Sequence, residues 1–194
     1  MSYAIMRFEK IKTNSISSIE SHHERLKEKY FSNPDIDLSK SNLNYHFKKP
    51  YDNYNNEVNT RIKDANCKVR SNSVKLVDTL VTSGNEFFLF NSEKEYFYRA
   101  YEFMCNKIGE ENIVSAVVHL DEKTPHLHLT FVPITEDKRL SAKDILGNRA
   151  KLIKWQDEFY AYMKKSYEEL ERGKSASETK RKHVPTNILK KWAV

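Results

Sequence analysis

Four segments of the chain show the pattern of apolar and polar positions that is typical of strands. In residues 2–11 the two kinds of side chain alternate, and we expect Ala4, Met6 and Phe8 to face inward. Residues 74–82 are a second candidate strand, followed by a Ser-Gly-Asn turn. Two further apolar runs, 113–120 and 126–134, flank the sequence Asp-Glu-Lys-Thr-Pro and predict a β-hairpin.

Apolar residues spaced three and four apart predict helices over 17–31, 93–108 and 149–171. The second has the clearest ends, because Ser92 and Glu95 match a capping box and Gly109 suits the position after a helix. Residues 38–72 are polar and poorly periodic, so we expect loops there with one helix near 57–69. This order of elements predicts an α+β fold, with a largely antiparallel central sheet and helices packed on one side.

Three of the seven histidines lie within ten residues of the expected hairpin: His119, His126 and His128. Side chains alternate between the two faces of a strand, so His126 and His128 share one face. His119 joins them if it pairs with His126. In that register the opposite face is entirely apolar and carries Val114, Ala116, Val118, Leu120, Leu127, Leu129 and Phe131. A slip by one residue would put the histidines into the core, so the pattern favours the register that gathers three imidazoles.

Three imidazoles on one exposed face suit a divalent metal ion that keeps positions open for substrate and water. The alternative is that they are only polar residues on a solvated strand face. Asp121 and Glu122 in the connecting turn could act as a general base, orient a histidine, or simply form the turn. A metal on three histidines leaves hydrolysis, redox chemistry and phosphoryl transfer open.

The charge of the chain is concentrated at its end. The 194 residues carry a net charge of +6, and residues 172–194 hold seven basic residues and one acidic residue, which accounts for the whole excess. Residues 38–72 form a second basic region within a body that is neutral overall. Such patches indicate an anionic partner, and together with a metal site they favour a phosphodiester substrate.

Composition excludes several classes of protein. A hydrophobic fraction of 39% is too high for a disordered chain. The four glycines form neither a dinucleotide-binding motif nor a phosphate-binding loop. No stretch approaches the roughly 20 apolar residues of a membrane span, and the N-terminus lacks the apolar core of a signal peptide. Two cysteines without a CxxC motif argue against a secreted disulfide scaffold, so we expect a cytoplasmic location.

The motif HxDExxPHxH at 119–128 resembles that of the Mob/Pre (MobV) plasmid mobilisation relaxases, which belong to the HUH endonuclease group. The N-terminal sequence MSYAIMRFEKIK, SHHERL at 21–26, SNLNY at 41–45 and ELERGK at 169–174 extend the resemblance over nearly the whole chain. It implies an antiparallel sheet of about five strands with the metal site on its open face. It also implies nicking of one strand at a plasmid transfer origin, covalent attachment to the 5′-phosphate, and later rejoining.

The resemblance also implies roles for single residues. It assigns Mn²⁺ or Mg²⁺ to three ligands, His119, His126 and His128. It assigns His22 as the nucleophile, whose ring would form a phosphoramidate, and Glu122 as the residue that orients or deprotonates His22. A second histidine, His23, departs slightly from the family pattern and remains an alternative nucleophile. Tyr45 is the other alternative, because most HUH relaxases use a tyrosine.

The expected partner is plasmid transfer-origin DNA, as a hairpin with a single strand at the nick. We expect DNA contacts from basic and amide side chains, namely Arg25, Asn44, Lys48, Lys49, Arg61, Arg70, Arg172, Lys174, Lys180, Arg181 and Lys182. Residues 1–171 are then the catalytic domain, and 172–194 a basic C-terminal segment on the DNA. Family members usually continue into a C-terminal part linked to dimerisation or membrane association, so a homodimer through such a region is a further expected partner. The rival functions are a non-catalytic DNA-binding module or repressor at a plasmid origin, and a metallohydrolase of small phosphate esters.

Overall fold

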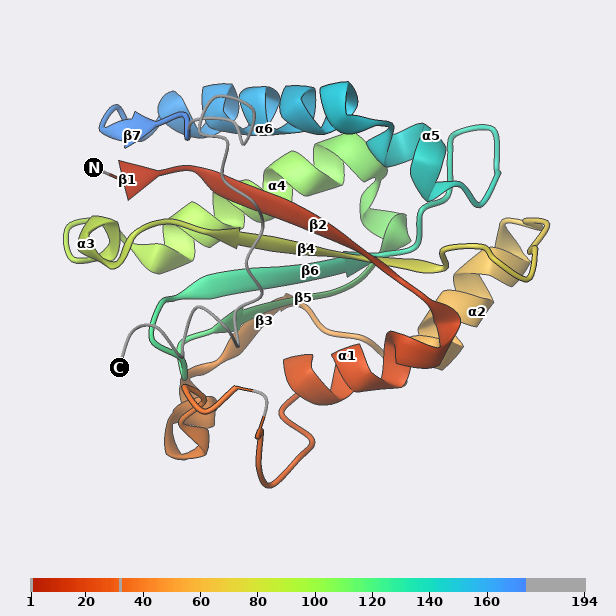
Figure 1. The fold of residues 1–194 in the computed structure, drawn as a ribbon, viewed down its shortest axis with the longest axis horizontal. Helices are drawn as coiled ribbons and strands as arrows, with labels where there is room; N and C mark the ends of the chain where they lie inside the picture. The colour runs from red at the N-terminus through yellow and green to blue at the C-terminus, as the bar shows by residue number, and fades with distance from the viewer. Residues whose placement is uncertain (1, 32, 174–194) are drawn as a thin grey trace.

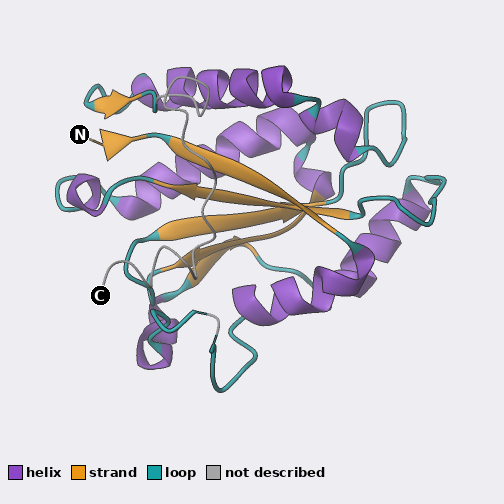
Figure 2. Ribbon diagram, viewed as in Figure 1, coloured by secondary structure: helices purple, strands orange, loops and turns teal. Residues whose placement is uncertain are grey.

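An antiparallel sheet of five strands forms the centre of the computed structural model, which describes residues 2–31 and 33–173 (Figures 1 and 2). Its strands, in spatial order, are β2 (Ile5–Ile11), β4 (Leu76–Thr82), β6 (His126–Phe131), β5 (Ile113–His119) and β3 (Tyr45–Lys48). A short parallel pair, β1 (Ser2–Tyr3) and β7 (Leu170–Glu171), forms a second, two-stranded sheet. Most of the predicted basic segment, 174–194, lies outside the described residues.

Helices lie on both faces of the sheet. In Figure 1, α4 (Glu93–Ile108) and α6 (Arg149–Lys164) lie above it and cover the larger apolar core. On the lower face, α1 (Ile16–His23) and α2 (Tyr54–Asp64) cover a smaller apolar cluster near one end of the strands. The predicted α+β class and five-stranded antiparallel sheet are confirmed. The sequence pattern did not anticipate the second layer of helices.

The remaining helical elements are short: α3 (Asn85–Phe88), α5 (Ala142–Leu146), and the 3-10 turns η1 (Thr13–Ser15), η2 (Leu38–Leu43) and η3 (Glu110–Asn112). Ser92 caps α4 as predicted, because its side chain accepts a hydrogen bond from the Glu95 N–H at 3.3 Å, which is one of the two bonds of a capping box. Gly109 follows with φ of 80°, a conformation that favours glycine. Within the described ranges, no helix has the length and apolar character needed to cross a membrane.

Two helices end earlier than their apolar stripes predict. The segment predicted as a helix over 17–31 is helical only to His23, and Arg25 then adopts a left-handed conformation with φ of 52°. Leu26, an apolar residue within the predicted helix, is 63% exposed. The helix predicted to continue to 171 stops at Lys164, and Leu170 instead joins β7. In both places tertiary contacts override the local periodicity.

The polar region 38–72 contains an edge strand that its composition concealed. β3 pairs with β5, and its few residues show no strong alternation. α2 begins at Tyr54, before the predicted start at 57, because the Asn53 side chain caps it by accepting a hydrogen bond from the Asn56 N–H.

The register of the hairpin agrees with the prediction near its turn, where His119 pairs with His126. A bulge between Ile113 and Ser115 changes the other end. It turns Ile113 into the larger core and Val114 toward the α2 side. The predicted face of Val114 is therefore wrong, because a bulged residue reverses the alternation beyond it.

The outer strand β2 is partly closed by a side chain of α6. The Gln156 Oε1 atom accepts a hydrogen bond from the Met6 N–H at 3.1 Å, and its Nε2 atom donates to the Ala4 carbonyl at 2.6 Å. The amide of Gln156 thus satisfies one donor and one acceptor on the free edge of the sheet.

Candidate active site

Three imidazole rings meet on the lower face of the sheet, where the last turn of α1 approaches it. They belong to His119 at the end of β5 and to His126 and His128 in β6, and their ring centroids lie 5.1 to 5.3 Å apart. All three residues are buried, with exposures of 8% or less. The prediction of an exposed histidine face is therefore wrong, because His22 and His23 at the end of α1 lie against these rings.

Each of the three histidines has one ring nitrogen facing a hydrogen-bond acceptor. His119 Nε2 lies 2.9 Å from the His23 carbonyl oxygen, and His126 Nδ1 lies 2.8 Å from the Thr124 carbonyl oxygen. His128 Nδ1 lies 2.9 Å from the Asp78 carboxylate. Because these partners can only accept, we assign the ring protons to these nitrogens.

The second nitrogen of each ring then carries a lone pair. Two of them, His119 Nδ1 and His126 Nε2, lie 3.3 Å apart with no proton between them. Such an approach is repulsive unless a cation stands beside both atoms. Fixed tautomers with converging lone pairs are the arrangement found around protein-bound metal ions, so the donor set fits a divalent cation.

Burial keeps His119 and His126 neutral, as metal ligands must be. Desolvation, followed by the neighbouring charge of His128, lowers the pKa of His126 to about 4. The pKa of His119 is lowered for the same two reasons. A neutral ring offers a lone pair to a metal ion at physiological pH, whereas a protonated ring does not.

His22, in the last turn of α1, is the partly open member of the cluster. Its ring meets those of His119 and His128 edge-on, with centroids 5.7 and 5.5 Å away, and its side chain is 29% exposed. Its Nε2 atom lies 4.0 Å from Glu122 Oε1. Desolvation, with the charges of His128, His23 and Arg25, lowers the pKa of His22 to about 3, so the ring is neutral near pH 7.

Arg25 holds the two acids of the hairpin turn. Its Nε and Nη2 atoms donate to Asp121 at 2.8 and 2.7 Å, and Nη2 also donates to Glu122 at 2.8 Å. Glu122 accepts a further hydrogen bond from Asn33, and Asp121 one from Ser41. Although burial opposes ionisation, the hydrogen bonds from Arg25 and Ser41 lower the pKa of Asp121 to about 2.

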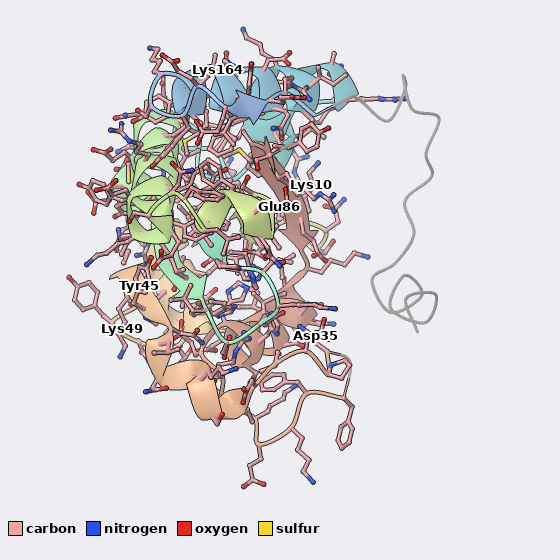
Figure 3. All side chains as sticks on the ribbon, turned by 90° about the vertical axis from the view of Figure 1, so that its left-hand side faces the viewer. Lys10, Asp35, Tyr45, Lys49, Glu86 and Lys164 are labelled. Atoms are coloured by element: carbon pink, nitrogen blue, oxygen red, sulfur yellow. The ribbon has the colours of Figure 1, made fainter. Side chains whose placement is uncertain are left out.

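The two alternative nucleophiles lie in poorer positions. His23 is 1% exposed and stacks behind His128, with a centroid separation of 4.2 Å, so DNA has no access to its ring. Tyr45 pairs with Val118, which faces the larger core, so its side chain lies on the opposite face from the histidines; Figure 3 labels it at the β3 side of the sheet. Its hydroxyl is buried without a hydrogen-bond partner.

Several residues expected to contact DNA have internal partners. The Arg25 side chain is only 6% exposed, so it supports the acids rather than the surface. Asn44 accepts a hydrogen bond from the Leu120 N–H, and Arg61 binds Glu57 and the Glu111 and Ile113 carbonyls. Lys48 donates to the Glu110 carbonyl, and Arg172 pairs with Asp157.

The other expected DNA contacts divide into two groups. Lys49 and Arg70 are exposed. The others lie outside the described residues: Lys174, Lys180, Arg181 and Lys182. Inside the site, the sequence analysis missed Asp78, Asn33 and Ser41. For Asp78 there was a signal, since it is the only charged residue in the apolar run of β4.

Comparison with known proteins identifies the family. The family model described as plasmid recombination enzyme (Mob_Pre) matches residues 1–191. The chain belongs to this family. The predicted resemblance to Mob/Pre proteins is therefore confirmed.

Curated members of the Mob_Pre family are similar over the same region. The plasmid recombination enzyme type 3 of Mammaliicoccus lentus is 40% identical over 191 residues, which cover 94% of this chain and 46% of the relative. The plasmid recombination enzyme of Lactiplantibacillus plantarum is 39% identical, with 95% and 53% covered. The chain thus spans about half the length of the curated relatives that it matches.

A solved structure of the family has the same fold. The MobM relaxase domain (MOBV; Mob_Pre), in a Mn-bound crystal structure with 22-nucleotide oriT DNA of plasmid pMV158, matches with a TM-score of 0.89 and 31% identity. The match covers 99% of this chain and 100% of that domain.

Proposed function

We propose that this chain is the catalytic domain of a plasmid relaxase, which nicks one DNA strand at a transfer origin and remains attached to its 5′-phosphate. One observation carries the proposal. His22, a neutral and partly exposed imidazole, lies against the rings of His119 and His128, and the unprotonated nitrogens of His119 and His126 face each other at 3.3 Å. The similarity to a Mn-bound relaxase domain in complex with oriT DNA supports it.

Three residues would hold the metal ion, Mn²⁺ or Mg²⁺: His119, His126 and His128. When bound there, the cation would neutralise charge on the non-bridging oxygens of the scissile phosphate. Asp78 and the carbonyls of His23 and Thr124 keep the ring protons on the outer nitrogens. The protein therefore fixes the ring tautomers that leave one nitrogen of each histidine free to bind the ion.

His22 would supply the nucleophile. The lone pair of its unprotonated nitrogen attacks phosphorus, a P–N bond forms and the P–O3′ bond breaks. The ring loses its one proton, and the departing 3′ oxygen gains one to become a hydroxyl, so the step is balanced. The product is a phosphoramidate, and attack by a 3′ hydroxyl reverses the step and rejoins the strand.

Glu122 would orient the His22 ring and accept its proton. Its Oε1 atom lies within 4.0 Å of nitrogens of His22, His119 and His126, so it faces the centre of the site. Arg25 and Asn33 donate hydrogen bonds to this carboxylate, and Arg25 also lies against His22, with its Nη1 atom 3.4 Å from His22 Nδ1. A carboxylate that is held in this way can orient an imidazole and accept its proton as attack proceeds.

DNA outside the reacting phosphate would be held by surface cations. Lys49 and Arg70 remain candidates among the described residues. We assign residues 172–194 to the DNA duplex or hairpin beside the nick, on the basis of their charge. Removing residues 174–194 should weaken binding and flatten its salt dependence, measured by anisotropy with an origin hairpin.

Covalent selection from random DNA tests the proposal. The chain is incubated with Mn²⁺ and single-stranded oligonucleotides of randomised sequence, and strands that stay on the protein in denaturant are sequenced. We expect one enriched sequence with a fixed break point, and mass spectrometry should find the 5′-phosphate on His22. The bond should break in acid, as a phosphoramidate does and a tyrosine ester does not.

His22→Ala is the decisive variant and His46→Gln its matched control. His22→Ala should form no adduct, while His46→Gln should form it normally. Undiminished adduct in His22→Ala would overturn the nucleophile assignment. Sequence-specific binding by the native chain without any adduct, under every metal ion tried, would instead identify a non-catalytic DNA-binding module.

A further inference from the structure

One row of residues crosses the sheet from the metal site to its outer edge. The backbone register aligns Arg7 of β2 with Leu80 of β4, and Leu80 with His128 of β6. Residues aligned in this way across neighbouring strands point to the same face. Arg7 therefore lies two strands from His128 on the histidine face, about 10 Å away at a spacing of about 4.8 Å per strand.

The surface of the sheet between Arg7 and the histidines, called the floor below, is partly open to solvent. Ile5, Leu80 and Thr82, which surround this row on the same face, are all partly exposed. Toward the other end of the same strands, Ile11 and Leu76 are buried in the apolar cluster beneath α1 and α2. The open half of the face is thus continuous with the site at which His22 meets the three histidines.

Arg7 is an exposed cation at the end of this floor. Across the two described ranges, no acidic side chain forms an ion pair with it. Glu9, the next residue on this face of β2, is also exposed and lies toward the covered half. An anionic strand would therefore be attracted to the Arg7 end of the floor and repelled farther along β2.

We propose that Arg7 binds a backbone phosphate of the DNA strand that is cut, close to the scissile phosphate, with the strand lying over Leu80. This inference rests on the proposed relaxase function. Charge complementarity favours a nucleic-acid backbone, and the floor's continuity with the histidine cluster favours the reacting strand. The contact fixes the position of the strand and carries no base preference.

The same strand offers a matched control. Lys10 is also exposed, but it pairs with Val77 and belongs to the opposite, α4-covered face (Figure 3). We compare Arg7→Gln with Lys10→Gln, each of which removes one positive charge. Binding is measured by anisotropy with a fluorescent single-stranded oligonucleotide of random sequence, at several salt concentrations.

Arg7→Gln should weaken binding about fivefold, the scale of one exposed charge contact. The slope of log K against log salt should become shallower by about 0.7, the value for one phosphate on a single strand. Lys10→Gln should change neither quantity. Equal behaviour of the two variants would overturn the proposal.

A phosphate scan on the selected origin oligonucleotide locates the contact. Single phosphates are replaced by neutral methylphosphonates, and binding is measured for the native chain and for Arg7→Gln. One position near the break should weaken the native chain and have no effect on the variant, as expected for two partners of one contact. If each methylphosphonate weakened binding by the native chain and by Arg7→Gln to the same extent, the contact would be refuted. If the native chain formed no adduct, the relaxase proposal would fail, while the anisotropy result would still decide whether Arg7 binds single strands.

Discussion

His119 Nδ1 and His126 Nε2 face each other at 3.3 Å across the hairpin, and the assigned tautomers leave both atoms without a proton. A divalent cation would relieve this repulsion and link β5 to β6. Adding Mn²⁺ should therefore raise the melting temperature of the chain, and a chelator should reverse the shift, because a ligand that binds only the folded state stabilises it.

His126→Asn tests whether that shift belongs to the triad. The variant should lose the Mn²⁺-dependent rise in melting temperature, measured by calorimetry with and without metal. His46→Gln should keep it, because His46 pairs with Glu24 and lies outside the triad. A shift that persisted in His126→Asn would place the metal ion elsewhere.

Asp78 fixes the proton of His128, so it should control metal affinity. Asp78→Asn keeps the shape but loses the charge that holds the His128 Nδ1 proton. We expect Mn²⁺ affinity to fall about 10- to 100-fold, the usual cost of removing such a partner. Free Mn²⁺ can be followed by electron paramagnetic resonance. Glu9→Gln, an exposed acid aligned with Asp78 on β2, is the control and should bind Mn²⁺ normally.

Arg25 should affect chemistry more than DNA binding. Arg25→Lys keeps the positive charge but cannot hold Asp121 and Glu122 together, because a lysine lacks the planar fork of a guanidinium. The rate of adduct formation at saturating DNA should drop roughly 10-fold or more, as expected when a catalytic group is misplaced. The dissociation constant for DNA should stay within twofold. Weaker DNA binding with an unchanged rate of adduct formation would instead indicate that Arg25 contacts DNA.

Tyr45→Phe separates the two candidate nucleophiles. The Tyr45 hydroxyl is buried without a partner on the face opposite the histidines. Adduct yield should be unchanged in Tyr45→Phe, as judged by denaturing gels. Stability to urea should be equal or higher, because an unsatisfied buried hydroxyl is removed. Loss of adduct in a folded Tyr45→Phe protein would contradict the His22 assignment.

Glu24 makes stability depend on pH. Burial opposes its ionisation, but hydrogen bonds from His46 and Tyr54 prevail and lower its pKa below the usual 4.5. A carboxylate with a lowered pKa stabilises the fold above its unfolded pKa, and the contribution is lost as pH falls through the folded pKa. Glu24→Gln should therefore cost roughly 1.5 to 3 kcal/mol at pH 7, the range for hydrogen bonds to charged groups.

The loss of folding stability caused by Glu24→Gln should shrink as the pH falls below about 4.5. At that pH the Glu24 carboxylate of the unsubstituted protein begins to protonate in the unfolded state. Urea unfolding at a series of pH values measures it. Glu28→Gln, at an exposed position four residues later, should show little cost at any pH. A cost for Glu24→Gln that did not vary with pH would mean that the residue acts through packing alone.

The hairpin was predictable because one strict rule governs it. Alternation placed the histidines on one face, and burial of the other face fixed the pairing of His119 with His126. The end of α1 was not predictable from periodicity. The apolar stripe continues to Leu26, but Arg25 turns out of the helix to reach Asp121 and Glu122, nearly a hundred residues away in sequence.

The bulge at Val114 and the edge strand β3 escaped prediction for the same physical reason. The bulge depends on how β5 pairs with β6, and β3 depends on its pairing with β5; side-chain patterns do not encode backbone pairing. The three metal-ligand candidates could be recognised from their residue type and their spacing along the sequence. Their outer partners, Asp78 and two carbonyl groups, come from separate segments that only folding brings together.

The amide of Gln156 also limits the addition of a further strand to the sheet. An outer strand with free N–H and carbonyl groups is a template on which another chain can add and begin aggregation. Gln156 occupies that template at Ala4 and Met6, as the end of a sixth strand would. A single side chain of α6 thus hinders another chain from adding as a strand at the β2 edge. It does so without covering the lower face of the sheet.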